Sequence, residues 1–255
     1  MSIKDRVALV TGGGRGVGKG ISLSLAAAGA SVAVNYRRDE ESAAETVREI
    51  EALGGKAIAF PASVDDYEQN AQMVADIERD LGPVSILVNN AGIASRGRSV
   101  VDTDPEEMRR VVATHAFGPH YLAALTLPKM RTLGRGDIVM ISSVATRSLG
   151  PNGAPYNMGK TAMEALAYTL AKEEREHGIR VNIVAPGLVD TDMGQRLIKA
   201  VQGVEDIRSL DQSMPFGRVC QPEDVANVVR FLVSDENSYL TGERLYCDGG
   251  GQLLR

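Results

Sequence analysis

Short apolar runs alternate along the chain with longer segments in which apolar residues recur every three or four positions. The runs are typical of buried strands, and the longer period is typical of amphipathic helices. The runs predict strands near residues 6–10, 31–36, 57–60, 84–89, 137–142, 180–184 and 243–247. The longer segments predict helices near residues 16–28, 40–53, 67–81, 105–134 with a break, 156–177 and 222–234. This alternation predicts an α/β fold with one doubly wound parallel sheet of about seven strands and helices on both faces.

The first apolar run leads into a glycine-rich turn. The strand over 6–10 is followed by Thr11-Gly-Gly-Gly-Arg-Gly-Val-Gly18 and then by a helix that ends before Gly29. Glycines can mark a tight turn alone, but between a strand and a helix they also let a pyrophosphate approach the backbone and the free N–H groups of the helix. This order favours a dinucleotide site on a Rossmann-type sheet. The residues expected at the phosphates are Gly12, Gly14, Arg15, Gly16, Val17 and Gly18.

A second chemical pattern follows the fifth predicted strand. Tyr156 and Lys160 are four residues apart and share one helix face, and Ser143 lies thirteen residues before Tyr156. Such a pair usually forms only a solvated face, but a nearby cation lowers a tyrosine pKa from about 10 and makes the phenol a usable acid or base. Ser143 can donate a hydrogen bond to a carbonyl oxygen that gains charge. These three residues are therefore candidates for catalysis of hydride transfer.

Composition and charge exclude several other classes of protein. The 255 residues carry a net charge of −5, which argues against nucleic-acid binding. Cys220 and Cys247 form no Cys-x-x-Cys pair, and the histidines lack zinc-ligand spacing with them, so we expect no metal. The chain has neither an apolar leader nor an apolar run of about 18 residues. We expect a single cytoplasmic domain over residues 1–255 with no membrane segment.

The residues after the second predicted strand bear on the choice of cofactor. An acidic side chain there accepts from the ribose 2′-hydroxyl of NAD(H) and repels the 2′-phosphate of NADP(H). Here Tyr36 stands in that place, followed by Arg37 and Arg38, and Arg15 lies in the glycine loop. Arginines after a strand are often plain surface charge, but guanidinium groups bind phosphate by paired hydrogen bonds. We therefore expect NADP(H), with Arg37 as its main contact.

Five motifs in order make the chain similar to the short-chain dehydrogenase/reductase (SDR) family over essentially its whole length. They are Thr11 to Gly18, Asn89-Asn-Ala-Gly92, the set Ser143, Tyr156 and Lys160, Pro186-Gly-Leu-Val-Asp-Thr191, and Asp248-Gly-Gly250. The resemblance implies that Tyr156 and Lys160 also contact the cofactor. It places Ser63 and Val64 at the adenine, Asn89, Ala91 and Gly92 at the ribose, and Pro186, Gly187, Val189 and Thr191 at the nicotinamide and pyrophosphate.

His115 departs from the pattern of these relatives. It stands where they carry an asparagine that supports a water leading to the catalytic lysine. A histidine there can still pass protons, and an ordinary pKa of about 6.5 would add a pH-dependent step. The alternative is a packed histidine that fills the asparagine's volume, and the sequence leaves both open. The resemblance also implies a lid between Met193 and Pro215, and substrate contacts from Ser143, Arg147, Leu149 and Leu188.

These features predict an enzyme that transfers hydride between NADPH and a ketone, with Ser143 stabilising the oxyanion and Tyr156 delivering the proton. The nearest resemblance is to 3-oxoacyl-acyl-carrier-protein reductases, so the expected substrate is a small carbonyl compound or an acyl thioester. One alternative is an NAD(P)⁺-dependent polyol or secondary-alcohol dehydrogenase. Another is a weakly catalytic nucleotide-binding sensor or partner subunit.

Two predicted helices carry more apolar residues than one core-facing stripe needs. The residues in question are Met163, Leu166, Ala167, Leu170, Tyr121, Leu122, Leu125 and Leu127. Surplus apolar surface packs against another copy in many soluble proteins, and SDR relatives pair these helices into tetramers. We therefore expect a homotetramer. The alternative is that all of these residues serve the core of one chain.

Overall fold

A seven-stranded parallel sheet forms the centre of the computed structural model, which describes residues 3–251. The strands are β1 Val7–Val10, β2 Ser31–Tyr36, β3 Lys56–Pro61, β4 Val84–Asn89, β5 Gly136–Ile141, β6 Ile179–Pro186 and β7 Arg244–Cys247. They lie in the order β3-β2-β1-β4-β5-β6-β7, and every neighbouring pair is parallel. Residues 1–2 and 252–255 of the expected domain lie outside the described part. The predicted α/β fold is confirmed.

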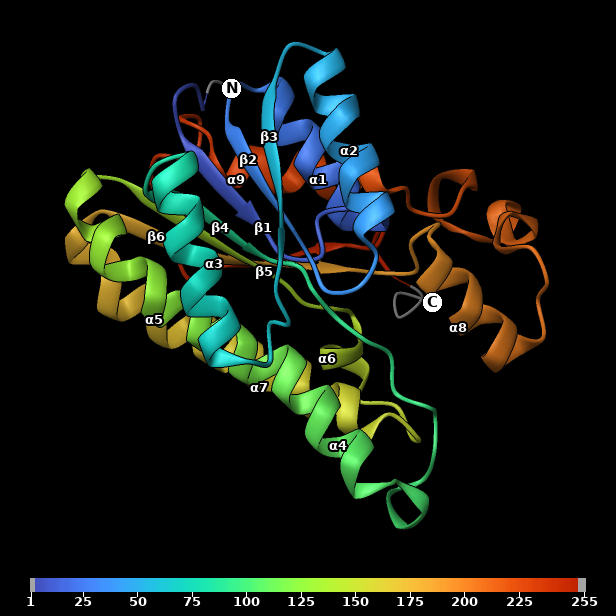
Figure 1. Ribbon diagram of the computed structural model, residues 1–255. Helices are drawn as coiled ribbons and strands as arrows, with labels where there is room; N and C mark the ends of the chain where they lie inside the picture. Colours follow the sequence, from blue (N-terminus) through green and yellow to red (C-terminus); the bar gives the residue numbers. More distant parts are fainter. Residues whose placement is uncertain (1–2, 252–255) are drawn as a thin grey trace.

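Helices cover both faces of this sheet (Figure 1). They are α1 Gly16–Ala27, α2 Glu40–Ala52, α3 Tyr67–Asp80, α4 Pro105–Val112, α5 Gly118–Met130, α6 Ala145–Ser148, α7 Ala154–Glu174, α8 Asp192–Gln202 and α9 Pro222–Val233. One large cluster of buried apolar residues joins the sheet to α1, α2 and α9, and another joins it to α3, α5 and α7. Strands buried on both faces explain why the apolar runs in the sequence are nearly continuous.

The helix expected over residues 105–134 is broken, as predicted. α4 ends at Val112 and α5 begins at Gly118, and a π-helical turn over Ala113–Phe117 joins them. Turns of this kind insert an extra residue into a helix and are frequent at functional sites. His115 is the central residue of this turn and is fully buried.

The apolar residues of α5 and α7 mostly serve the core of the chain itself. Leu122, Met163 and Ala167 are fully buried. Leu127 and Leu170 are buried as well. These five side chains therefore serve the chain's own core, whereas Tyr121, Leu125 and Leu166 are only partly buried. The exposed face of α7 is formed by smaller residues, which line an open hollow together with Leu149: Asn157, Met158, Thr161, Ala162 and Ala165.

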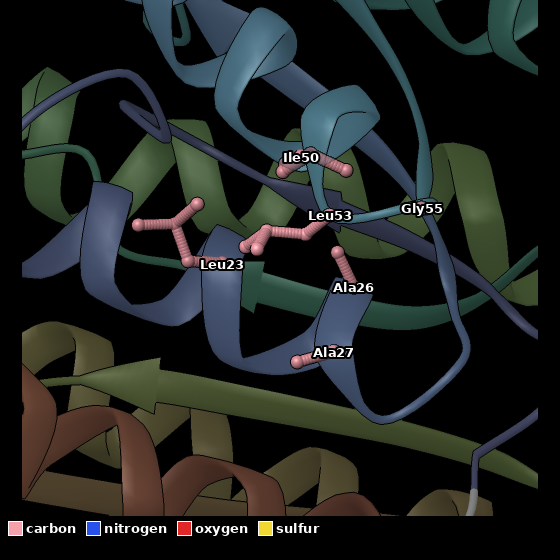
Figure 2. A pocket seen from close by; sticks show the side chains of 6 residues that line it. All are labelled: Leu23, Ala26, Ala27, Ile50, Leu53 and Gly55. Carbon is pink, nitrogen blue, oxygen red and sulfur yellow. The ribbon is translucent and has the colours of Figure 1, made fainter.

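A small apolar pocket lies where α1 meets the end of α2. Figure 2 shows its lining by Leu23, Ala26, Ala27, Ile50, Leu53 and Gly55. Its volume of about 10 Å³ is barely enough for one water molecule. The pocket is therefore a packing gap between two helices and not a ligand site.

The segment over 193–215, expected as an irregular lid, is largely helical. It contains most of α8 and a 3₁₀ turn over Ile207–Ser213, and it projects beyond the end of the sheet where β6 ends (Figure 1). Ile198 and Ile207 of this segment form a small core of their own together with Val219, which follows it. Thr191 begins α8, since its hydroxyl accepts a hydrogen bond from the Gly194 N–H at 3.1 Å.

Candidate active site

The carboxyl ends of four central strands meet along one edge of the sheet. The strand order reverses between β1 and β4, because the chain first builds outward from β1 to β3 and then returns to the other side of β1. Loops that leave the sheet at such a reversal frame a crevice in which α/β proteins bind ligands. The glycine loop follows β1, Asn89 ends β4, Ser143 follows β5 and Pro186 ends β6. The sheet therefore brings four of the five sequence motifs to the same end of the sheet.

The glycine loop fits the pyrophosphate of a dinucleotide. Gly12 and Gly16 have φ angles of +59° and +51°, which favour glycine, and a Cβ on Gly18 would lie 2.1 Å from the Gly12 carbonyl oxygen. A Cβ on Gly14 would lie 2.8 Å from the Ala43 Cα, so this glycine lets α2 approach the loop. α1 begins after Arg15 with no side-chain cap, which leaves its first N–H groups for an anion.

Side chains from β1, β2 and β4 hold this loop in place. The Thr11 hydroxyl accepts hydrogen bonds from the Asn90 and Ala91 N–H groups, both at 2.9 Å. The Asn90 amide donates to the Thr11 carbonyl oxygen at 2.8 Å, and the Asn35 amide oxygen accepts from the Gly12 N–H at 3.2 Å. Asn35 and Asn90 were not predicted as site residues. The sequence feature that could have identified them is an asparagine close to the carboxyl end of an apolar run.

The adenosine end of the site contains an acidic residue that the sequence analysis missed. Tyr36 ends β2 and is half-buried, and Arg37 and Arg38 follow it on the surface. Asp39 caps the N-terminus of α2, and its carboxylate accepts a hydrogen bond from the Ser42 N–H at 3.2 Å. Its Oδ2 lies 3.6 Å from Nη1 of Arg15. Exposed ion pairs of this kind contribute little free energy. Arg15 can therefore leave Asp39 when a phosphate offers a better partner.

The remaining predicted cofactor residues occupy three places around the crevice. Val64, just after Ser63, is buried against the start of α5, where a Cβ on Gly118 would lie 2.8 Å from the Val64 carbonyl oxygen. The Asn89 amide is buried and donates to the Met140 sulfur at 3.3 Å, so its side chain faces β5. Two others lie against the glycine loop, Ala91 beside Gly12 and Thr191 beside Gly16. Val189 instead forms a β-bridge with Cys220.

Ser143 and Tyr156 form the centre of the site. Ser143 lies just after β5, and Tyr156 lies in the first turn of α7, where Pro155 causes no loss of a helical hydrogen bond. Burial raises the pKa of Tyr156, and a hydrogen bond with the Ser143 side chain acts in the opposite direction. The fold therefore brings two side chains that lie thirteen residues apart in the sequence close enough to interact.

Lys160 is buried one helical turn after Tyr156. Its Nζ donates to the Ile141 carbonyl oxygen at 2.6 Å and lies 5.8 Å from the centre of the Tyr156 ring. Burial lowers the pKa of Lys160 to about 7, and the charge of Glu164 opposes that effect. The expectation that Lys160 lowers the Tyr156 pKa is wrong for this arrangement, because burial dominates and keeps the phenol protonated.

His115 is packed tightly beside Tyr156. Its ring meets the Tyr156 ring edge to face at a centroid distance of 5.1 Å, and its Nε2 lies 2.8 Å from the Ile93 carbonyl oxygen. A Cβ on Gly92 or on Gly159 would collide with it, at 2.7 and 2.9 Å. Burial, with the charge of Lys160, lowers the His115 pKa to about 3. Of the two alternatives that the sequence left open, this lowered pKa favours the packed, neutral histidine over a pH-dependent proton step.

The structure does not bring the three other predicted substrate residues together. Arg147 is exposed and lies over the Tyr246 ring, 5.3 Å from its centre. Leu149 lines the hollow on the outer face of α7. Leu188 packs against the small core of the lid segment, and the neighbouring Pro186 carbonyl oxygen accepts from the Val144 N–H at 3.0 Å.

Within residues 3–251, no cluster of side chains could hold a metal ion and no helix is long and apolar enough to cross a membrane.

Comparison with known proteins agrees with this geometry. A family model described as enoyl-(acyl carrier protein) reductase matches residues 12–252. The chain is 36% identical over 254 residues to a 3alpha-hydroxysteroid dehydrogenase of Mediterraneibacter gnavus, covering 99% of each chain. It is 35% identical over 243 residues to a 3-oxoacyl-acyl-carrier-protein reductase of Staphylococcus aureus, covering 95% of this chain and 96% of that one.

The solved structures extend the likeness to three dimensions. A 7 alpha-hydroxysteroid dehydrogenase, complexed with NADH and 7-oxo glycochenodeoxycholic acid, is similar with a TM-score of 0.90 at 33% identity. The match covers 98% of this chain and 95% of that one. Since the likeness spans the glycine loop, the sheet and the Ser143–Tyr156–Lys160 site, the chain belongs to the short-chain dehydrogenase/reductase family of oxidoreductases.

Proposed function

We propose that this oxidoreductase reduces a ketone to a secondary alcohol with NADPH as the hydride donor. The observation that carries the proposal is that the Ser143 and Tyr156 side chains interact at the carboxyl end of β5, with Lys160 buried one turn further along α7. Two hydroxyl donors that meet at one point can both reach a single carbonyl oxygen. Lys160, buried one turn further along α7, adds a positive charge behind them.

Each of these side chains has a task in the reduction. The nicotinamide, when bound, supplies a hydride to the carbonyl carbon. Ser143 donates a hydrogen bond to the carbonyl oxygen as negative charge develops there. Tyr156 then transfers its proton to that oxygen, and its raised pKa keeps the phenol protonated and suits it to act as an acid. Lys160 holds the nicotinamide ribose and balances the phenolate that remains.

The experiment that tests this function is a panel of ketones followed by the loss of NADPH absorbance. The panel includes 3-oxoacyl thioesters, because the Staphylococcus aureus relative carries that activity in its name, and steroid and small cyclic ketones. Reduction of at least one class, with formation of the secondary alcohol, is the expected result. Protein that binds NADPH but reduces no member of the panel would contradict the proposal and favour a nucleotide-binding sensor or partner subunit.

Arg37 is expected to set the preference for NADPH over NADH. A guanidinium can form paired hydrogen bonds with the 2′-phosphate, so NADPH should bind at least about tenfold more tightly, or about 1.4 kcal/mol. Arg37→Ala should remove most of that difference, as measured by fluorescence titration with both cofactors. Arg48→Ala, which removes an exposed arginine from α2, is the matched control and should leave it unchanged. Equal affinities in the unmutated protein would falsify the cofactor assignment.

A second candidate function is oxidation of a secondary alcohol, such as a hydroxysteroid or a polyol, with NAD⁺. Two observations favour it: the hydroxysteroid dehydrogenases among the relatives, one of them complexed with NADH, and the Asp39 carboxylate near Arg15. An acid in this region favours a free ribose 2′-hydroxyl. Rates with NAD⁺ and NADP⁺ on the same alcohol separate the two functions, and a preference for NAD⁺ supports the second.

We further propose that the enzyme works in the cytoplasm as a homotetramer, with α7 at a subunit interface. Its exposed face includes the small residues Thr161, Ala162 and Ala165, which suit close approach of a second helix. Light scattering should give about four times the 27.2 kDa of one chain. Ala165→Arg, at the centre of that face, should lower the measured mass, whereas Ala52→Arg at the exposed end of α2 should not. A mass of one chain for the unmutated protein would rule the tetramer out.

A further inference from the structure

Glu164 is a buried carboxylate that the proposed reaction does not use. It lies one helical turn after Lys160 on α7 and is only 4% exposed. Its Oε1 accepts hydrogen bonds from the hydroxyl groups of Ser142 at 2.5 Å and Thr146 at 2.8 Å. Its Oε2 accepts from Nη1 of Arg244 at 2.6 Å. Burial of a charged group is costly unless several partners satisfy it, and here both oxygens are satisfied.

These partners come from three elements that surround the active site. Ser142 immediately precedes Ser143 at the end of β5, Thr146 lies in α6 just after it, and Arg244 begins β7. Glu164 itself lies on the helix that carries Tyr156. The hydrogen bonds of Glu164 therefore fix the strand end that carries one reacting hydroxyl group against the helix that carries the other. A small displacement of either would separate donors that have to reach one oxygen atom.

The charge of Glu164 also acts on Lys160. Burial lowers the Lys160 pKa to about 7, and Glu164 is the group that opposes this lowering. On the far side of Glu164 lies Arg244, which also contacts the Tyr246 ring at 5.0 Å. His115, on the π-helical turn, faces Lys160 as a neutral ring. Tyr168, further along α7, interacts electrostatically with Arg244.

We propose that Glu164 is a positioning residue of this active site. It clamps the Ser143 strand end and α6 to α7 through hydrogen bonds from Ser142 and Thr146, and its negative charge favours the ammonium form of Lys160. This role rests on the proposed function, in which the Lys160 cation holds the ribose and balances the phenolate. It also explains why one carboxylate collects hydrogen bonds from residues as far as 80 positions away in the sequence.

The direct test is the titration of Lys160 itself. Protein with ¹³C- and ¹⁵N-labelled lysine is titrated by NMR, and Lys160→Met identifies the signal of Lys160. In Glu164→Gln, which keeps the size of the side chain and removes its charge, the Lys160 pKa should fall by about one unit. In Glu164→Asp, which keeps the charge, it should stay close to that of the unmutated protein.

Glu174→Gln provides the matched control. Glu174 is also a buried carboxylate on α7, but it pairs with Arg131 at 2.6 Å and lies ten residues beyond Glu164, about 15 Å along the helix. Its neutralisation should lower stability without moving the Lys160 titration. An equal shift in both glutamine variants would overturn the proposal, because it would mean that any loss of charge on α7 has the same effect.

Arg244→Gln keeps the proposal testable even if Glu164→Gln does not fold. Arg244 is partly exposed, and its removal leaves the Glu164 charge without its cationic partner. The field of Glu164 at Lys160 then grows, so the Lys160 pKa should rise, opposite in sign to the Glu164→Gln shift. An unchanged titration in Arg244→Gln, or in a folded Glu164→Gln, overturns the proposal.

Kinetics supply a separate readout. For any ketone that the unmutated protein reduces, kcat is measured as a function of pH. The pH at which kcat falls should be lower in Glu164→Gln than in the unmutated protein, by the same amount as the shift in the Lys160 pKa. KM for the ketone should change less than kcat, since Glu164 does not touch the substrate. A shifted titration in a protein that reduces no ketone would leave the positioning role standing and refute only the proposed function.

Discussion

Replacement of Tyr156 with phenylalanine is expected to lower the turnover of any accepted ketone at least about a hundredfold while cofactor binding survives. Phenylalanine keeps the ring that packs edge to face on His115, so the local structure should persist. What is lost is the hydroxyl group that meets Ser143 and carries the proton. Steady-state kinetics together with a fluorescence titration of NADPH check both parts of the prediction.

Tyr239→Phe is the matched control for this variant. Tyr239 is 96% exposed, so loss of its hydroxyl group should leave kcat and KM as they are. If Tyr156→Phe retains full turnover, another group delivers the proton. His115 is a poor candidate for that task, because burial lowers its pKa to about 3 and leaves almost none of it protonated. The Ser143 hydroxyl would be the next group to test.

Asp137→Asn is expected to produce the largest loss of stability, about 3 kcal/mol. Asp137 lies in β5 at the opposite end of the sheet from the site and is 1% exposed. Its Oδ2 accepts from Nη1 of Arg6 at 2.7 Å, and its Oδ1 accepts from Nε of Arg180 at 2.9 Å. Nε of Arg135 lies 3.4 Å from Oδ2 of the same carboxylate. Neutralisation would leave several guanidinium groups partly buried without their common acceptor.

Denaturant unfolding at one protein concentration measures this loss as a lower midpoint. The control is Asp76→Asn on α3, since Asp76 also pairs with an arginine, Arg79, but at the surface. Exposed ion pairs contribute little, so this variant should unfold like the unmutated protein. Equal midpoints for Asp137→Asn and Asp76→Asn would show that the buried cluster does not stabilise the fold.

Much of the fold was predictable because burial leaves a periodic trace in the sequence. β1 and β4 are buried along their full length; β1 is an unbroken apolar run, and β4 is apolar except for Ser85 and Asn89. The break between α4 and α5 was also expected, but its π-helical form was not. Hydrogen-bond register inside a helix depends on what packs against it, and here Gly92 and Gly159 make the space for His115.

The chemistry of the site was less predictable, because a pKa depends on burial and on neighbours that are distant in the chain. Tyr156 and Lys160 were found from their spacing, together with the glycine turn and the resemblance to a known family. The raised pKa of Tyr156 and the lowered pKa of Lys160 result from burial, which the spacing does not reveal. The acid near Arg15 was missed for a similar reason. Asp39 caps the N-terminus of α2, and only the fold brings its carboxylate near Arg15 of the glycine loop.

The sequence by itself determined the order of strands and helices, the glycine loop and the helix that pairs Tyr156 with Lys160, because these follow from local periodicity and from residues near one another. Only the tertiary structure decided that Met163 and Leu170 serve the chain's own core, that His115 is neutral, and that Glu164 joins β5, α6 and β7. A periodic pattern shows which face of an element is buried. It does not show which surface covers that face, and burial energies, pKa values and long-range hydrogen bonds all depend on that partner.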